Sequence, residues 1–228
     1  MNHSGLNNND MLTEQRQKRG IRVTIAILLL FIVAVLVGFV HKLSQPRVIT
    51  DSELRLNGAV KLQKARILDN FQLVSDTGEV FHTDSLKGQW TLVFFGFTHC
   101  PDICPTTLST LNSFYQLLDG NTRSNTEIIL VTVDPARDNP KILHDYVRYF
   151  NKEFHGITGD FFEIKRFASQ LNVPFNKVML DEGGYTVDHG SQVVLINPLG
   201  HYHAFFKAPL DPAKLKLTYR SIRATFNG

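Results

Sequence analysis

The sequence predicts an α/β fold, in which one domain of alternating strands and helices follows a single transmembrane helix. Three observations support this prediction. An uncharged apolar segment lies near the N-terminus, and the rest of the chain holds two continuous apolar runs typical of strands buried on both faces. Segments with apolar residues at helical spacing lie between and after these runs, which is the order found in a partly parallel sheet.

The first predicted element is a membrane anchor over residues 23–40. The segment reads VTIAILLLFIVAVLVGFV and holds no charged residue. A helix of this length spans about 27 Å at 1.5 Å per residue, close to a hydrocarbon core of roughly 30 Å. A cleaved signal peptide is the alternative, but no A-x-A-like cleavage site follows the segment. We therefore expect an uncleaved anchor.

Basic residues around the anchor predict its orientation. Four precede it and two follow closely, namely Arg16, Lys18, Arg19 and Arg22 before it and Lys42 and Arg47 after it. The positive-inside rule makes residues 1–22 a cytoplasmic tail and sends the rest of the chain across the membrane. The tail contains acidic residues, unlike a mitochondrial transit peptide. We expect a single-pass protein of the bacterial inner membrane with a periplasmic domain; the mitochondrial inner membrane is the alternative.

The part beyond the anchor divides into a predicted tether over residues 41–66 and a domain over residues 67–228. Residues 1–42 hold five Lys/Arg and two acidic residues, so they account for the whole net charge of +3. The remaining chain is neutral and lacks the basic face of a nucleic-acid-binding protein. Two cysteines exclude a disulfide-built scaffold and a four-cysteine zinc site.

Strand signals in the domain are apolar runs and hairpin turns. A Ser-Asp-Thr-Gly turn joins the first two strands, and Pro-Leu-Gly joins the last two. The runs WTLVFFGFT and EIILVTV between them predict strands buried on both faces. In chain order, the predicted strands are residues 71–74, 80–82, 90–98, 127–133, 191–197 and 202–207.

Apolar residues recur at steps of three and four in four predicted helices. The first follows Pro105 and ends at Gly120. The others begin after the N-cap residues Asn139, Asp160 and Asp211. Their apolar faces consist of Leu108, Leu111, Tyr115 and Leu118 in the first helix, Leu143, Tyr146, Val147 and Phe150 in the second, Phe161, Ile164, Ala168 and Leu171 in the third, and Leu215, Tyr219, Ile222 and Phe226 in the fourth.

Both cysteines lie in the segment THCPDICP, residues 98–105. The segment follows a buried strand, at the carboxyl edge where open α/β sheets place their sites. Pro105 predicts that Cys104 occupies a helix N-cap, where unpaired N–H groups and the helix dipole favour a thiolate. The spacing lets both sulfurs reach one ion or form a disulfide. A structural disulfide is the weaker reading, because closing so short a loop stabilises by only about 2 kcal/mol.

A metal site needs a further ligand besides the two thiolates, and imidazole suits copper. The chain has nine histidines. His99 is adjacent to one cysteine and could not turn onto the same ion, whereas His201 and His203 alternate along a strand and fit a polar face. His189 lies in a predicted loop before a strand. These patterns alone do not select one histidine.

The run FFGFTHCPDICPTTLSTL resembles the Sco/SenC family of membrane-anchored copper proteins, and the similarity extends from about Ile67 to Phe206. It includes the segments VTVDPARD and HGITGD and an Asp-His pair. The resemblance implies a thioredoxin-like fold with extra strands and helices. It also implies one copper ion, Cu(I) or Cu(II), bound through Cys100, Cys104 and His189.

Members of this family deliver copper to the binuclear CuA centre of cytochrome c oxidase, and some reduce the disulfide of the copper-free site. The resemblance therefore implies the copper-bearing oxidase subunit as partner, together with an upstream copper donor or a thiol reductant. Two positions depart from the family pattern. Gly190 stands where members commonly have serine, and Asn197 stands where they have aspartate.

Three functions remain open at this point. The first is a copper metallochaperone without enzymatic turnover, which the C-x₃-C spacing and His189 favour. The second is a thiol–disulfide oxidoreductase, which needs Cys100 and Cys104 but has no use for the histidine. The third is a redox or copper sensor. A catalytic zinc site is weaker, because only His99 or Asp134 could serve as its general base.

Three acidic residues are candidates for supporting the metal ligands. Asp134 and Asp138 follow the second buried strand, at the same sheet edge as Cys100, and Asp188 adjoins His189. A carboxylate behind a ligand can orient it and tune its basicity. The alternative for all three is ordinary turn chemistry beside the neighbouring prolines.

Overall fold

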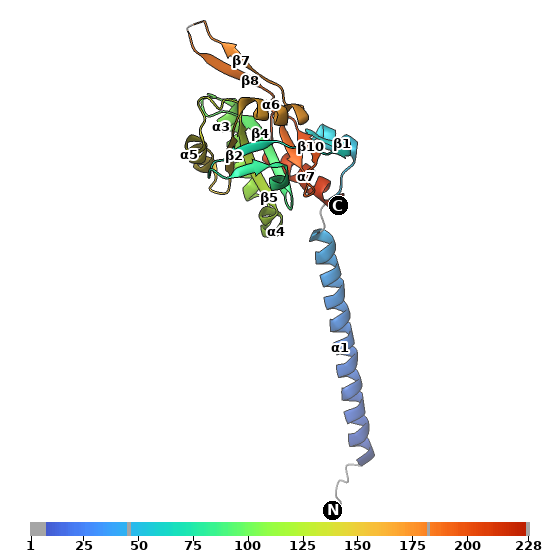
Figure 1. The fold of residues 1–228 in the computed structure, drawn as a ribbon. Helices are drawn as coiled ribbons and strands as arrows, with labels where there is room; N and C mark the ends of the chain where they lie inside the picture. The colour runs from blue at the N-terminus through green and yellow to red at the C-terminus, as the bar shows by residue number, and fades with distance from the viewer. Residues whose placement is uncertain (1–7, 45–46, 182, 227–228) are drawn as a thin grey trace, which may run out of the picture. The chain divides into compact units, whose positions relative to one another are not determined.

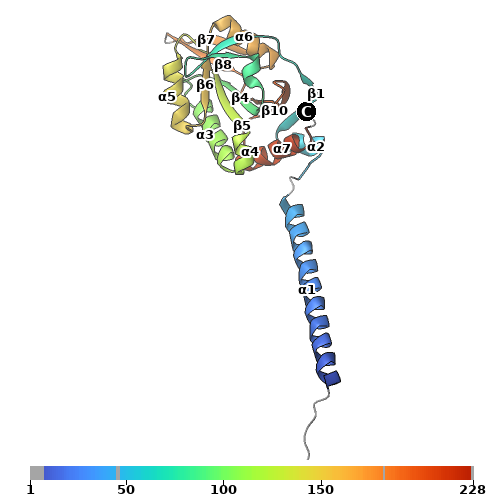
Figure 2. The same cartoon turned by 60° about the horizontal axis from the view of Figure 1, so that its bottom comes forward.

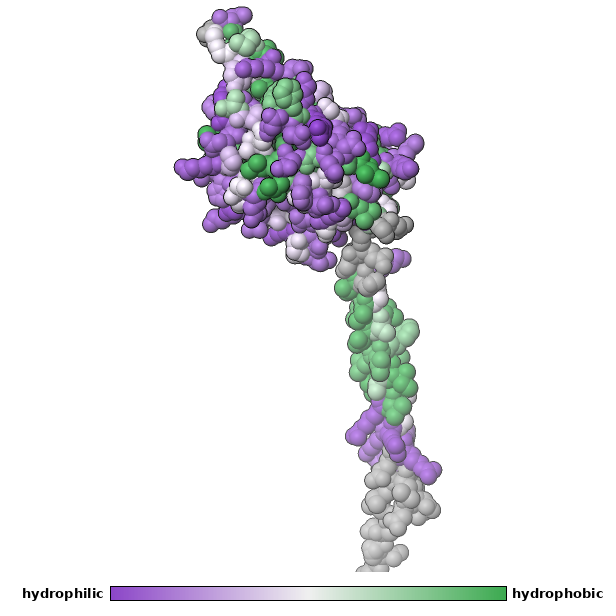
Figure 3. All heavy atoms as spheres, viewed as in Figure 1, coloured by the Kyte–Doolittle hydropathy of each residue, from purple (hydrophilic) through white to green (hydrophobic). Residues whose placement is uncertain are grey.

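The computed structural model describes residues 8–44, 47–181 and 183–226, which fall into two units divided between residues 46 and 47. The first unit holds helix α1 (Asn8–Ser44), drawn in blue in Figure 1. Its segment Arg16–Val40 is long and apolar enough to cross a membrane, and none of it is buried within the structure. Figure 3 shows this apolar band in green, with hydrophilic side chains in purple preceding it. The predicted anchor lies inside the segment.

The second unit is built on a mixed sheet of eight strands in the order β1-β10-β9-β4-β5-β6-β2-β3. Strands β4, β5 and β6 run parallel, and their outer neighbours are antiparallel. This confirms the predicted mixture of parallel and antiparallel pairs. The strands are β1 (Ala59–Arg66), β2 (Gln72–Ser75), β3 (Val80–His82), β4 (Trp90–Gly96), β5 (Thr126–Thr132), β6 (His155–Thr158), β9 (Val193–Ile196) and β10 (Tyr202–Phe206).

Helices surround the sheet, and a separate two-stranded hairpin projects from the domain at the top of Figure 1. Helix α3 packs against α5 and α7, and α5 packs on β6. In Figures 1 and 2, β1 and α5 lie on opposite sides of the domain. The remaining elements are α2 (Asp51–Leu56), η1 (Thr83–Leu86), α3 (Ile103–Gln116), α4 (Gly120–Ser124), α5 (Pro140–Phe150), α6 (Phe161–Gln170), α7 (Pro212–Ala224), β7 (Phe175–Met179) and β8 (Tyr185–His189).

The structure confirms the long apolar runs and three of the predicted helix caps, Asn139, Asp160 and Asp211. Every residue of β4 is buried, as a central strand with neighbours on both sides requires. The side chains of Asn139, Asp160 and Asp211 each accept backbone N–H groups at the starts of α5, α6 and α7. The four predicted helices and six predicted strands are all present, with boundaries that differ by a few residues.

The predicted tether over residues 41–66 is wrong for its second half. Strand β1 pairs antiparallel with β10, with Ala59 opposite Phe206, and so belongs to the sheet. Leu54 of α2 is buried in the core of the same domain. The sequence concealed both elements because α2 is a short helix and β1 is an edge strand whose side chains are mostly exposed or half-buried.

Strand β6 and the β7–β8 hairpin were missed. Strand β6 has four residues inside the segment HGITGD, which is too short and too polar to predict a strand. The side chains of β7 are mostly exposed and those of β8 are mostly half-buried, so neither strand has the apolar alternation that marks a strand with one buried face. This second omission matters for the site, because His189 is the last residue of β8.

Candidate metal centre

The cysteines lie where β4 passes into α3. The chain turns after the strand, and the Cys100 N–H donates to the Phe97 carbonyl over 3.2 Å. Helix α3 begins earlier than predicted, with Asp102 as its N-cap, so Cys104 lies in the first helical turn instead of at the cap. Its side chain is fully buried, whereas Cys100 is half-buried.

The structure brings Cys100, Cys104 and His189 together. One donor atom from each lies within 4.8 Å of the other two, and in the described residues this is the one such group of three or more. The Cys104 sulfur is 3.7 Å from Nε2 of His189. The Cys104 backbone N–H points at the Cys100 sulfur over 3.4 Å. Both cysteines are free thiols.

A backbone carbonyl orients the ring of His189. Its Nδ1 lies 3.1 Å from the Gly190 oxygen, which can only accept, so the neutral ring carries its hydrogen on Nδ1. The lone pair of Nε2 then faces Cys104. Asp188, predicted to orient the ring, has an exposed side chain, and the Gly190 carbonyl takes that place. The predicted loop around His189 is instead the end of a strand.

Burial favours the neutral forms of two of these groups, the Cys104 thiol and the His189 imidazole. It raises the pKa of the Cys104 thiol well above its usual value, and the backbone contact at Phe97 opposes this only in part. It also lowers the pKa of His189 below 6.5. The metal-free site therefore holds a protonated Cys104 and a neutral imidazole. The predicted thiolate at Cys104 is wrong for this state, because desolvation outweighs the helix dipole.

The backbone of Gly96 lies against the sulfur of Cys104. A Cβ atom at this position would be 2.9 Å from that sulfur and 3.1 Å from side-chain atoms of Leu130 and Phe94. Any larger residue here would displace the cysteine or a core side chain. The sequence offered one signal for this role, a lone glycine near the end of a buried aromatic strand.

Asp138 holds the segment that leads into the cysteines. Its carboxylate is fully buried and accepts three hydrogen bonds, from the Thr98 N–H at 3.0 Å, the Thr98 hydroxyl at 2.5 Å and the Thr132 hydroxyl at 2.6 Å. Thr132 ends β5, so Asp138 ties the segment before Cys100 to the neighbouring strand. The predicted position of Asp138 at this sheet edge agrees with the structure.

Asp134 contacts the β7–β8 hairpin, which contains His189. It accepts a hydrogen bond from the Tyr185 hydroxyl at 2.9 Å and forms an ion pair with Arg137. The Arg137 guanidinium lies 4.1 Å from the centre of the Tyr185 ring, and the Lys177 ammonium lies 3.5 Å from it. These contacts fasten β8 four residues before its histidine. The sequence gave no reason to select Tyr185 or Arg137.

Tyr146 was predicted only as part of an apolar helix face. Its hydroxyl is buried and has no hydrogen-bond partner in the described residues. Burial raises its pKa, and the charges of Cys104 and Cys100 act in the same direction. The sequence pattern could not distinguish this buried phenol without a partner from an ordinary core tyrosine.

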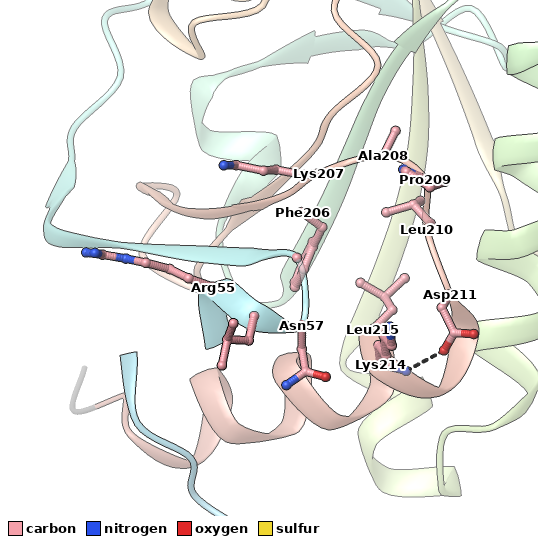
Figure 4. A pocket seen from close by; sticks show the side chains of 12 residues that line it. Arg55, Asn57, Phe206, Lys207, Ala208, Pro209, Leu210, Asp211, Lys214 and Leu215 are labelled. Carbon is pink, nitrogen blue, oxygen red and sulfur yellow. Dashed lines mark hydrogen bonds between the residues drawn. The ribbon is translucent and has the colours of Figure 1, made fainter. Parts of the chain in front are cut away.

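A cavity of about 410 Å³ lies elsewhere, between α2 and the β10–α7 connection (Figure 4). Three basic residues line it, Arg55, Lys207 and Lys214. In Figure 4 the side chains of Arg55 and Lys207 extend away from Asp211, whose carboxylate accepts the Lys214 N–H at 2.8 Å and caps α7. The basic groups do not converge, and no predicted site residue lines this cavity.

Comparisons with known proteins agree with this geometry. The family model described as SCO1/SenC matches residues 59–222. The SCO2-like protein of Rickettsia prowazekii is 36% identical over 160 residues, which cover 69% of this chain and 78% of the relative. Copper-bound ScoI of Arabidopsis thaliana is 31% identical with a TM-score of 0.66, and copper-bound ScoI of Bradyrhizobium japonicum is 31% identical with a TM-score of 0.62. Each alignment covers 70% of this chain and 99% of the solved one. The likeness confirms the predicted thioredoxin-like α/β fold with added elements.

Proposed function

Because the chain belongs to the SCO1/SenC family, we propose that it is a copper metallochaperone that delivers its ion to the CuA centre of cytochrome c oxidase. It binds one copper ion through Cys100, Cys104 and His189. The observation that supports this most directly is the approach of two sulfurs and one imidazole nitrogen within 4.8 Å. The copper-bound ScoI structures support the choice of metal.

The donor set fits Cu(I) better than zinc. Thiolate is a soft ligand and imidazole suits copper, and three such donors complete a trigonal Cu(I) site. A structural zinc site takes four ligands, and the group in the described residues ends at three. The neutral His189 with its nitrogen lone pair directed at Cys104 is ready to bind without losing a proton.

The two cysteines have different roles in the proposed transfer. Cys104 is buried against Gly96 and binds the copper ion from the protein interior. Cys100 is half-buried, and the residues between the cysteines, 101–103, are exposed. A recipient's thiolates therefore reach the site from the side of Cys100 and replace the ligands one at a time. Delivery needs no chemical step besides ligand exchange, in which the Cys104 sulfur takes up a proton from solvent as the ion leaves.

A second candidate function is a thiol–disulfide oxidoreductase, and the contact between the cysteines favours it. The Cys104 N–H directed at the Cys100 sulfur would stabilise a thiolate there. This thiolate attacks a partner's disulfide and forms a mixed disulfide. The Cys104 sulfur then releases the partner as a dithiol and leaves a Cys100–Cys104 disulfide, which an external thiol must reduce.

Copper loading and transfer test the proposal. The reduced full-length chain in detergent, incubated with Cu(I) without oxygen, should retain one copper per chain after gel filtration. Mixing it with a copper-free CuA-bearing domain of an oxidase subunit should then move the copper to that domain, measured by metal analysis after separation. A chain that retains copper but never releases it would be a sensor or store. A chain that retains no copper would contradict the metallochaperone and leave the thiol–disulfide oxidoreductase as the candidate function.

We also propose that residues 23–40 anchor the chain in a bacterial inner membrane with the domain in the periplasm. The excess of basic residues before the apolar segment supports this orientation. Alkaline phosphatase fused after Gly228 should be active, and β-galactosidase fused at the same place should be inactive. The reverse pair of results would place the cysteines in the cytoplasm and contradict the proposed route of copper.

A further inference from the structure

A buried carboxylate away from the cysteines lacks a partner for one of its oxygens. The Asp76 side chain is completely buried in the turn after β2. Its Oδ1 has no hydrogen-bond partner within the described residues. Asp76 approaches β6 closely, since its N–H donates to the Gly156 carbonyl over 2.7 Å. A dehydrated carboxylate oxygen without a partner is costly to bury, so this position favours a hydrogen-bond donor or a cation.

Two imidazoles stand beside this carboxylate. Nδ1 of His144, on α5, is 3.2 Å from Oδ2, and Nδ1 of His155, on β6, is 3.6 Å from Oδ1. Both side chains are more than one third exposed, at 37% and 39%. Within the described part of the chain, Asp76 pairs with these two histidines and with no lysine or arginine. Three separate segments thus place two imidazoles and one carboxylate together.

We propose that Asp76, His144 and His155 form a second metal site, for a divalent ion of the Zn²⁺ or Cu²⁺ class. Imidazole and carboxylate are the ligands that such borderline ions take, and two histidines with one carboxylate recur as a metal-binding set. Donors about 2.0–2.2 Å from one ion lie roughly 3–3.6 Å apart, close to both separations found here. This site has no thiolate and so would not compete with the cysteines for Cu(I).

Closing the site requires a side-chain movement. The three donors do not all lie within 4.8 Å of one another, a condition that only the cysteine group meets among the described residues. His144 and His155 approach different oxygens of the carboxylate, so one ring must turn toward the unpartnered Oδ1. Their exposure leaves room for this rotation, whereas Asp76 is held in place by the backbone contact with Gly156.

Zinc titration of a chain without the cysteine site tests the proposal. The full-length Cys100→Ser/Cys104→Ser variant in detergent should bind one Zn²⁺ per chain, measured by calorimetry against a competing chelator. Adding His144→Ala or His155→Ala should weaken this binding more than tenfold in each case, because each removes a ligand. His201→Ala is the matched control, a half-buried histidine on another part of the surface, and should leave the affinity unchanged within twofold.

A spectroscopic readout separates this site from adventitious zinc binding. With Cu²⁺ as the probe, the electron paramagnetic resonance spectrum should show coupling to two nitrogens, reduced to one in either histidine variant. Asp76→Asn should weaken binding as well, and circular dichroism will show whether that variant is folded. If Asp76→Asn is unfolded, the affinities of the His144→Ala and His155→Ala variants test the site without it. Absence of saturable Zn²⁺ uptake, or equal affinity in all three histidine variants, would overturn the proposal.

Discussion

Cys100→Ser or Cys104→Ser is expected to abolish tight Cu(I) binding, with a loss in affinity of at least a hundredfold. Each change replaces a soft thiolate with a hard hydroxyl that Cu(I) binds poorly. The fold should persist, because the cysteines are free thiols in the structure and even a disulfide closing this loop would contribute only about 2 kcal/mol. Competition of each variant with a Cu(I) chelator measures the loss.

The two cysteine variants should differ in stability even though both lose copper. Cys104 is fully buried, so a serine there places a hydroxyl in the core and costs about 1–3 kcal/mol of unfolding free energy. Cys100 is half-buried, and its serine variant should unfold close to the wild type. Thermal unfolding without metal provides the comparison. Unfolding of the Cys100 variant at ordinary temperature would show that the pair is structural.

His189→Ala should lower the affinity for Cu(I) more than tenfold, which corresponds to more than about 1.4 kcal/mol. The change removes the third donor and leaves two thiolates that competing thiols can displace. Disulfide exchange through Cys100 and Cys104 should stay largely intact, because it depends on thiolate nucleophilicity and access. The contribution of the protein to oxidase assembly should be lost. Chelator competition and a disulfide-exchange assay on the same preparation measure the two properties.

His99→Ala is the matched control for this variant. His99 is exposed and precedes Cys100 in the chain, but it does not belong to the group of three donors. Its replacement should leave copper affinity unchanged within twofold. Equal copper affinities in the wild type and His189→Ala would eliminate the three-ligand site, and the oxidoreductase would become the leading function. A loss in disulfide exchange equal to the loss in copper affinity would indicate misfolding instead.

The sequence predicted those parts of the fold that depend on residues close together in the chain. Strand β4 is buried on both faces, so its sequence is apolar throughout and needs no knowledge of its neighbours. Asn139 and Asp211 cap helices through hydrogen bonds that span three residues, and such contacts can be read from the sequence. The C-x₃-C segment belongs to the same class, since both sulfurs lie within one turn.

The missing parts depend on contacts between distant segments. Strand β1 forms by pairing with β10, and its own side chains show no clear alternation of buried and exposed positions. His189 meets Cys104 only through the β7–β8 hairpin, and residue type alone did not select it from nine histidines. The raised pKa of Cys104 follows from burial by the whole domain, which overrides the local preference of a helix start.

The 85 positions that separate Cys104 from His189 give the bound ion a further effect. An ion held by both residues cross-links the β4–α3 junction to β8 and restricts the unfolded chain like a disulfide around a loop of that length. The chain-entropy estimate for such a closure is about 4.5 kcal/mol, so the copper-bound protein should resist unfolding better than the copper-free protein. Proteases that act on opened chains would then degrade the copper-free protein and spare the copper-bound protein.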